Sequence, residues 1–133
     1  MLEQSWQYYS DFCLCFLIIL LYGNYRCNHP SFKDPLQKII SNSAGIDMWS
    51  ITHLLFYMYI GYYYPDTFEQ SMTIGILWEI FEFLNGKYRF KIFNNFGHCA
   101  GTDNNLWWYG KYSDLLMNAT GFLIGKKLSN ISL

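Results

Sequence analysis

Four apolar stretches separated by polar segments set the strongest limit on how this chain can fold. They cover about residues 6–25, 48–64, 68–84 and 112–128. The first contains the run FCLCFLIILLY and is close to uniformly apolar, whereas the other three also carry polar groups. A helix needs about 17–25 residues to cross a bilayer, so all four are long enough, three of them near the lower limit. The sequence therefore predicts an all-α protein, a polytopic membrane bundle of about four transmembrane helices.

The composition supports this prediction. Charged residues make up 14% of the chain, below the quarter typical of soluble domains, and aromatic residues reach 21%. Trp49, residues 62–64, Trp107 and Trp108 lie at ends of the stretches, as in the aromatic belts of membrane proteins. With 133 residues the chain has room for a single domain, 1–133. The alternative is that only the first stretch crosses a membrane and the others are buried helices of a soluble fold.

The basic residues predict an orientation. Four spans would place loops 26–47 and 85–111 on one side, and residues 85–110 would lie on the membrane surface. These loops hold seven of the nine basic residues: Arg26, Lys33, Lys38, Lys87, Arg89, Lys91 and Lys111. Since basic loops usually stay in the cytoplasm, we expect both loops there. The net charge of −1 and the lack of a basic tract exclude nucleic acid as an expected partner.

Five polar residues inside the stretches are the candidate functional groups. They are His53, Glu79, Glu82, Asp114 and Asn118. Ionisable groups inside a span cost about 2.5–3.5 kcal/mol each and usually face the interior of the bundle. At a rise of about 1.5 Å per residue, all five would lie within about 10 Å of the same membrane face, which predicts one shared site.

This set of side chains suits two kinds of chemistry. His53, Glu79, Glu82 and Asp114 could bind a divalent cation, with the oxygen ligands favouring Ca²⁺, Mg²⁺ or Mn²⁺ and the imidazole allowing Zn²⁺. All five residues could instead perform general acid–base catalysis, with one carboxyl group protonating a leaving group. The alternative is a polar clamp that only holds the helices, or a partner helix, in place.

A close-packing motif follows Asn118 in the last stretch. Gly121 and Gly125 form G-x-x-x-G, a pattern typical of helices that pack closely against each other. Packing within the chain explains the motif, and a homo-oligomer formed through the two glycines is a further expectation.

The spacing of these residues resembles the VanZ-like membrane proteins. The resemblance covers about residues 47–128 and rests on an Asp/His pair, a W-E-x-x-E helix and a final D-x-x-x-N-x-x-G-x-x-x-G helix. The residues that carry it are Asp47, His53, Gly75, Trp78, Glu79, Glu82, Asp114, Asn118, Gly121 and Gly125. The resemblance implies a small protein of four or five spans. It implies no agreed reaction, because members are linked to glycopeptide resistance or are uncharacterised.

The chain also resembles the base-exchange phosphatidylserine synthases, which are calcium-dependent lipid head-group enzymes. The shared features are a membrane His, the W-E-x-x-E helix, the pair Trp107–Trp108 and the Asp/Asn/Gly helix. That family has many more spans, and it usually has an acidic residue where this chain has Tyr109. The two resemblances together predict a membrane protein that acts on lipid or lipid-linked head groups, with membrane lipid as its partner.

Overall fold

The computed structural model describes residues 2–29, 31–88 and 110–132. Within these ranges the chain forms four α-helices: α1 (Leu2–Asn28), α2 (Met48–Tyr63), α3 (Phe68–Tyr88) and α4 (Tyr112–Ser132). The all-α prediction is therefore confirmed. A short 3-10 helix, η1 (Pro35–Gln37), and an antiparallel hairpin of β1 (Ile39–Ser41) and β2 (Ile46–Asp47) connect α1 to α2. The sequence analysis did not predict this hairpin.

The helices begin close to where the apolar stretches predict them. The largest differences are four residues: α1 begins four residues before its predicted start, and α3 and α4 each continue four residues past their predicted ends. The expected stop at Asn85 and Gly86 fails because Asn85 is buried inside the fold rather than exposed in a turn. Of the expected surface loop 85–110, residues 89–109 lie outside the described ranges.

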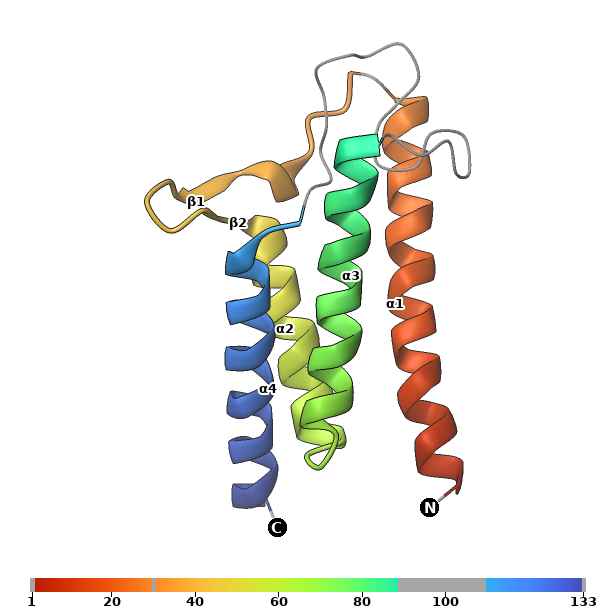
Figure 1. Cartoon of the computed structure of the whole chain (residues 1–133), viewed down its shortest axis with the longest axis vertical. Coiled ribbons are helices and arrows are strands. Elements are labelled where there is room, and N and C mark those ends of the chain that lie inside the picture. The colour runs from red at the N-terminus through yellow and green to blue at the C-terminus, as the bar shows by residue number, and fades with distance from the viewer. Residues whose placement is uncertain (1, 30, 89–109, 133) are drawn as a thin grey trace.

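The four helices run alternately up and down, as Figure 1 shows. Helices α1 and α3 run toward the hairpin, and α2 and α4 run away from it. We call the side with the hairpin and the first turns of α2 and α4 the hairpin end. The opposite side, with the first turn of α1, the α2–α3 turn and the last turn of α4, is the terminal end.

Helices α2 and α4 pack closely because glycines stand where their backbones meet. A Cβ atom on Gly121 would lie 2.2 Å from the carbonyl oxygen of Leu54, and one on Gly125 would lie 2.0 Å from that of Met58. Gly61 of α2 meets the backbone of α4 in the same way. Small residues allow this close approach. The homo-oligomer contact stays a prediction, and Gly121 and Gly125 both face α2 of the same chain.

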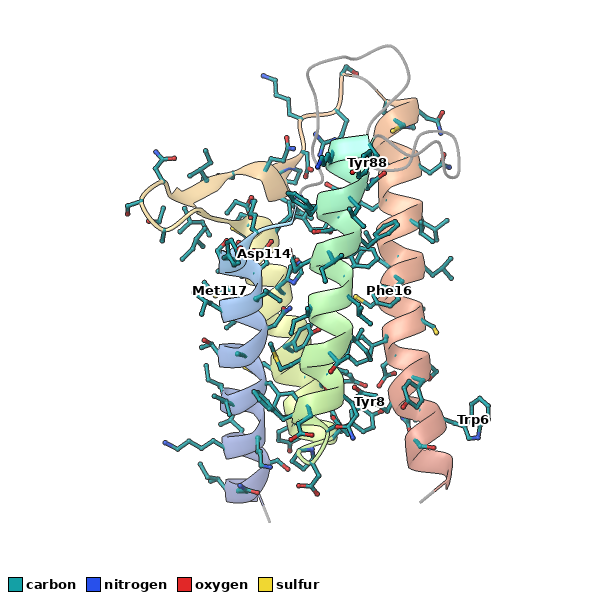
Figure 2. The ribbon with its side chains drawn as sticks, viewed as in Figure 1. Trp6, Tyr8, Phe16, Tyr88, Asp114 and Met117 are labelled. Atoms are coloured by element: carbon teal, nitrogen blue, oxygen red, sulfur yellow. The ribbon has the colours of Figure 1, made fainter. Side chains whose placement is uncertain are left out.

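Helix α1 contacts the other helices through long aromatic side chains. Phe12 is buried and lies edge-on to Phe56, with ring centroids 5.2 Å apart. Phe16 stacks on Trp78 at 4.7 Å. Figure 2 shows Tyr8 pointing toward the other helices. Because rings span these contacts, α1 stands further from its neighbours than α2 does from α4.

Apolar side chains cover the outer faces of the helices, while polar side chains lie inside. Large exposed apolar residues occur on every helix, among them Leu17, Leu21, Leu55, Leu77, Phe83, Leu116 and Leu123. The buried polar residues in the described ranges are Asp47, Ser50, Ser71, Glu79, Glu82, Asn85, Asp114 and Asn118. So many large exposed apolar side chains, together with so many buried polar ones, are unusual for a water-soluble helical bundle.

By length and composition, one helix in the described ranges could cross a membrane. It is the segment Ser5–Asn28 of α1, with a mean hydropathy of 1.2. Only 11% of that window is buried, which is unlike the core helix of a soluble protein. An apolar helix near the N-terminus is also typical of a signal sequence. The finding supports one candidate span, and the multi-pass arrangement stays a prediction.

Candidate functional site

Three helices bring ionisable side chains together toward the hairpin end. His53 of α2, Glu79 of α3 and Asp114 of α4 each offer one ligand atom, and these atoms all lie within 4.8 Å of one another. Glu79 and Asp114 are buried, and His53 is half-buried. Figure 2 shows Asp114 in the first turn of α4, beside the hairpin. Three of the five candidate residues from the sequence therefore meet at one point.

Asn118 orients the imidazole of His53. Its Oδ1 lies 2.9 Å from Nδ1 of the ring. Because an amide oxygen can only accept, Nδ1 carries the proton and the lone pair of Nε2 remains open. Asn118 is 1% exposed, and its Nδ2 has no hydrogen-bond partner among the described residues. An acceptor that fixes the second nitrogen in this way is typical of histidines that bind metals.

One carboxylate oxygen of Glu79 accepts a hydrogen bond, and the other has no partner among the described residues. Its Oε2 accepts a hydrogen bond of 2.8 Å from the backbone N–H of Lys111. Its Oε1 is buried and has no partner within the described ranges, in a residue that is 6% exposed. Gly110 allows the chain to pass this close to α3, since a Cβ there would lie 2.4 Å from the carbonyl oxygen of Glu79. A buried carboxylate oxygen without a donor is costly, so Oε1 suits a bound cation or proton.

Polar contacts tie the start of α2 to the start of α4. Asp47 caps α2 in a capping box with Ser50. The Ser50 hydroxyl also donates a hydrogen bond to Asp114, and the Lys111 ammonium pairs with Asp47. Asp47 enters the sequence-based prediction only through the family resemblance, and Ser50 and Lys111 are not among the predicted site residues. The D-x-x-S spacing before an apolar stretch was the signal for the first two.

Glu82 lies one helical turn after Glu79, further toward the hairpin end. It is buried and lines the same cavity as His53, Asp114 and Asn118. Its carboxylate is not part of the cluster formed by His53, Glu79 and Asp114. Of the four metal ligands expected from the sequence, the structure thus brings three to one point and places Glu82 beside them.

A cavity of about 460 Å³ lies between α1 and the other three helices, and His53 and Asp114 of this site line it. Its size is in the range of small-molecule sites, about 300–1,000 Å³. Polar residues line one part of it: His53, Glu82, Lys111, Asp114 and Asn118. Most of the remaining wall is apolar, with Phe16, Ile19, Phe56, Ile74 and Trp78 among its residues. The candidate site is therefore the polar end of an apolar cavity.

The chain has no match among models of protein families, among curated proteins or among solved structures. The resemblance to the VanZ-like proteins thus rests on the residues that carry it. The Trp107–Trp108 pair of the second resemblance lies outside the described residues.

The donor set fits a divalent cation. Two carboxylates and one imidazole would supply three protein ligands, as in catalytic metal sites that keep a position open for water or substrate. Ligand atoms up to 4.8 Å apart suit a larger cation such as Ca²⁺, whose ligands stand at about 2.3–2.6 Å. Zn²⁺ and Mg²⁺, with ligands at about 2.0–2.1 Å, need a small inward rotation of the side chains. The imidazole ligand favours Zn²⁺ over Ca²⁺ or Mg²⁺.

Proposed function

We propose that this chain is a membrane-embedded enzyme of four spans that acts on lipid or lipid-linked head groups. The distribution of side chains supports the membrane setting. Large apolar residues cover all four helices, and a water-soluble protein rarely exposes so much apolar surface. In a bilayer the same surface faces hydrocarbon, and the polar side chains are sheltered between the helices.

One observation carries the catalytic part of the proposal. His53, Glu79 and Asp114 converge from three different helices, and Oε1 of Glu79 is buried without a partner in the described ranges. Ionisable groups in a membrane segment are expensive, and groups that serve only packing are expected to satisfy one another. A buried carboxylate oxygen without a partner, in a cluster with an imidazole and a second carboxylate, is instead typical of a site for a ligand.

The residues have distinct roles in this proposal. His53, Glu79 and Asp114 hold a divalent cation, which polarises the head-group oxygens when it is bound. Glu82, one turn away in the same cavity, is the further carboxyl group that can protonate a leaving alcohol. Asn118 is a positioning residue that sets the imidazole tautomer. The resemblance to the base-exchange phosphatidylserine synthases supports this substrate class.

Elemental analysis of the detergent-purified protein tests the cation site. We expect about one Ca²⁺, Mg²⁺, Mn²⁺ or Zn²⁺ per chain, and loss of most of it in Glu79→Gln, because a metal site depends on each of its few ligands. Glu82→Gln should keep the metal. Glu69→Gln is the matched control, since Glu69 is exposed in the first turn of the same helix. Equal metal content in Glu79→Gln and Glu69→Gln would contradict the assignment.

A lipid assay tests the reaction class. The protein is reconstituted in vesicles of mixed phospholipids with a divalent cation and free serine or ethanolamine, and the lipids are followed by mass spectrometry. In the proposed step, the hydroxyl oxygen of the incoming alcohol, or of water, bonds to phosphorus as the bond to the leaving head-group alcohol breaks. We expect the rate to fall by about 10²-fold or more in Glu82→Gln, the size of a lost general acid. An unchanged lipid profile in all conditions would overturn the enzyme proposal.

The contacts between helices favour a second candidate, a non-catalytic protein held together by a polar clamp. Asn118 bonds to His53, Ser50 bonds to Asp114, and Glu79 holds the segment before α4. Glu79→Ala separates the two candidates. An inserted, folded variant without metal or activity supports the enzyme, whereas a variant that unfolds and is degraded supports the clamp.

A further inference from the structure

The cavity beside the candidate site is much longer than a head-group site requires. It follows α1 from Tyr22 back to Asp11, which is about 16 Å along the helix. Between its ends the wall is formed by apolar and aromatic side chains such as Phe12, Phe16 and Ile74. A small polar substrate bound at His53 would leave most of this wall uncovered.

The cavity opens sideways, along the outer face of the molecule. Leu14 and Ile18 of α1 line it and are 56% and 58% exposed, and Tyr59 of α2 lines it and is 40% exposed. These residues stand at the boundary between α1 and α2, so the opening lies between the two helices. This opening is thus continuous with the apolar outer surface of the helices.

Tyrosine hydroxyls bind the acidic residue that lines the part of the cavity near the terminal end. Asp11 is the acidic residue there, and its Oδ2 accepts hydrogen bonds from the hydroxyls of Tyr64 at 2.7 Å and Tyr59 at 3.2 Å. The other end of the cavity is lined by His53, Asp114 and Asn118, and Nδ2 of Asn118 is buried without a partner among the described residues. Between Asp11 and these residues the cavity has a long apolar arm.

We propose that the apolar arm binds one hydrocarbon chain of a membrane phospholipid, which enters from the bilayer between α1 and α2. The head group of the same lipid then lies at His53, Glu79 and Asp114. This inference rests on the proposed function for its membrane setting, and it names the substrate as a lipid with its chain attached. Three observations support it: the length of the apolar wall, the sideways opening and the polar side chains toward the hairpin end.

Two cysteines on α1 provide a direct test. Cys15 is half-buried and lines the cavity, whereas Cys13 is exposed and does not line it, and both are free. The detergent-purified protein is treated with an alkyl maleimide, with and without added phosphatidylcholine, and each cysteine is read by peptide mass spectrometry. We expect the phospholipid to slow alkylation of Cys15 about tenfold, which corresponds to about 90% occupancy of the cavity, and to leave Cys13 unchanged. Equal rates at Cys15 with and without phospholipid would overturn the proposal.

A matched pair of variants tests the same inference by measuring how much phospholipid the protein retains. Cys15→Trp fills the apolar arm, and Cys13→Trp adds the same side chain on the opposite face of the helix. Native mass spectrometry should find a retained phospholipid in the wild type and in Cys13→Trp, and about tenfold less in Cys15→Trp. Equal retention in both variants would overturn the proposal. If Cys15→Trp does not fold, the alkylation rates of the wild type decide alone.

The tests of lipid-chain binding and the tests of the proposed enzyme activity can fail independently of each other. Glu79→Gln should lose metal and head-group activity but still retain the phospholipid, because the apolar arm is unchanged. Head-group activity without protection of Cys15 would overturn the chain-binding inference alone. Protection of Cys15 without any head-group activity would support chain binding and overturn the proposed enzyme.

Discussion

At the scale of single residues, Asn118 tests whether the imidazole of His53 is held as a ligand. Leu in place of Asn118 keeps a similar volume but removes the oxygen that fixes Nδ1. We expect Asn118→Leu to bind the divalent cation about 10- to 100-fold more weakly, as when the partner of a metal-binding histidine is lost. Titration calorimetry of the folded, detergent-purified protein measures this, with Thr120→Val on the exposed face of α4 as the control. Equal affinity in both variants would exclude Asn118 as a positioning residue for a metal-binding His53.

The site residues also differ in how far the sequence reveals them. His53, Glu79 and Asp114 could be predicted because polar residues in apolar stretches face inward, and their distance from the stretch ends gives a common depth. Ser50 and Lys111 could not, because their roles depend on which helix starts lie side by side. That arrangement follows from packing across the whole fold, which spacing within one stretch does not encode.

At the scale of helices, Gly125 tests the close packing of α2 and α4. Replacing glycine by alanine inside a helix usually stabilises it by about 0.5–1 kcal/mol. A Cβ at position 125 would lie 2.0 Å from the carbonyl oxygen of Met58, so the two backbones must separate. We expect Gly125→Ala to destabilise the protein by about 1–3 kcal/mol, typical of overpacking, and Thr120→Ala to have little effect. Unfolding curves in detergent measure both, and a stabilised Gly125→Ala would contradict the contact.

The helices also show where prediction of their ends from the sequence fails. The four apolar stretches located all four helices. The expected stop at Asn85 and Gly86 does not end α3, because Asn85 packs inside the fold. The hairpin before α2 was missed because it is short and its exposed residues show no apolar alternation. Its turn uses Gly45 at a φ of 63°, a left-handed conformation that glycine adopts without strain.

At the scale of the whole molecule, two features oppose each other on orientation. Seven of nine basic residues lie in loops 26–47 and 85–111, which favours the cytoplasm for the hairpin end. Cys27, in the last turn of α1 at the same end, is disulfide-bonded, and disulfides persist mainly in oxidising compartments. The charge signal acts during insertion and fixes orientation first, so we expect the hairpin end in the cytoplasm.

Cysteine labelling of intact cells tests the orientation and the span count together. Asn42 in the hairpin turn and Asp66 in the α2–α3 turn are both exposed and lie at opposite ends of the fold. An impermeant maleimide should label Asp66→Cys from outside and reach Asn42→Cys only after permeabilisation.

Labelling of both positions from the same side would exclude a second span. Labelling in the reverse order would keep the four spans, agree with the disulfide at Cys27 and move the site of His53, Glu79 and Asp114 to the outer leaflet. The lipid chain would then enter from that leaflet, since the site and the opening between α1 and α2 belong to one cavity.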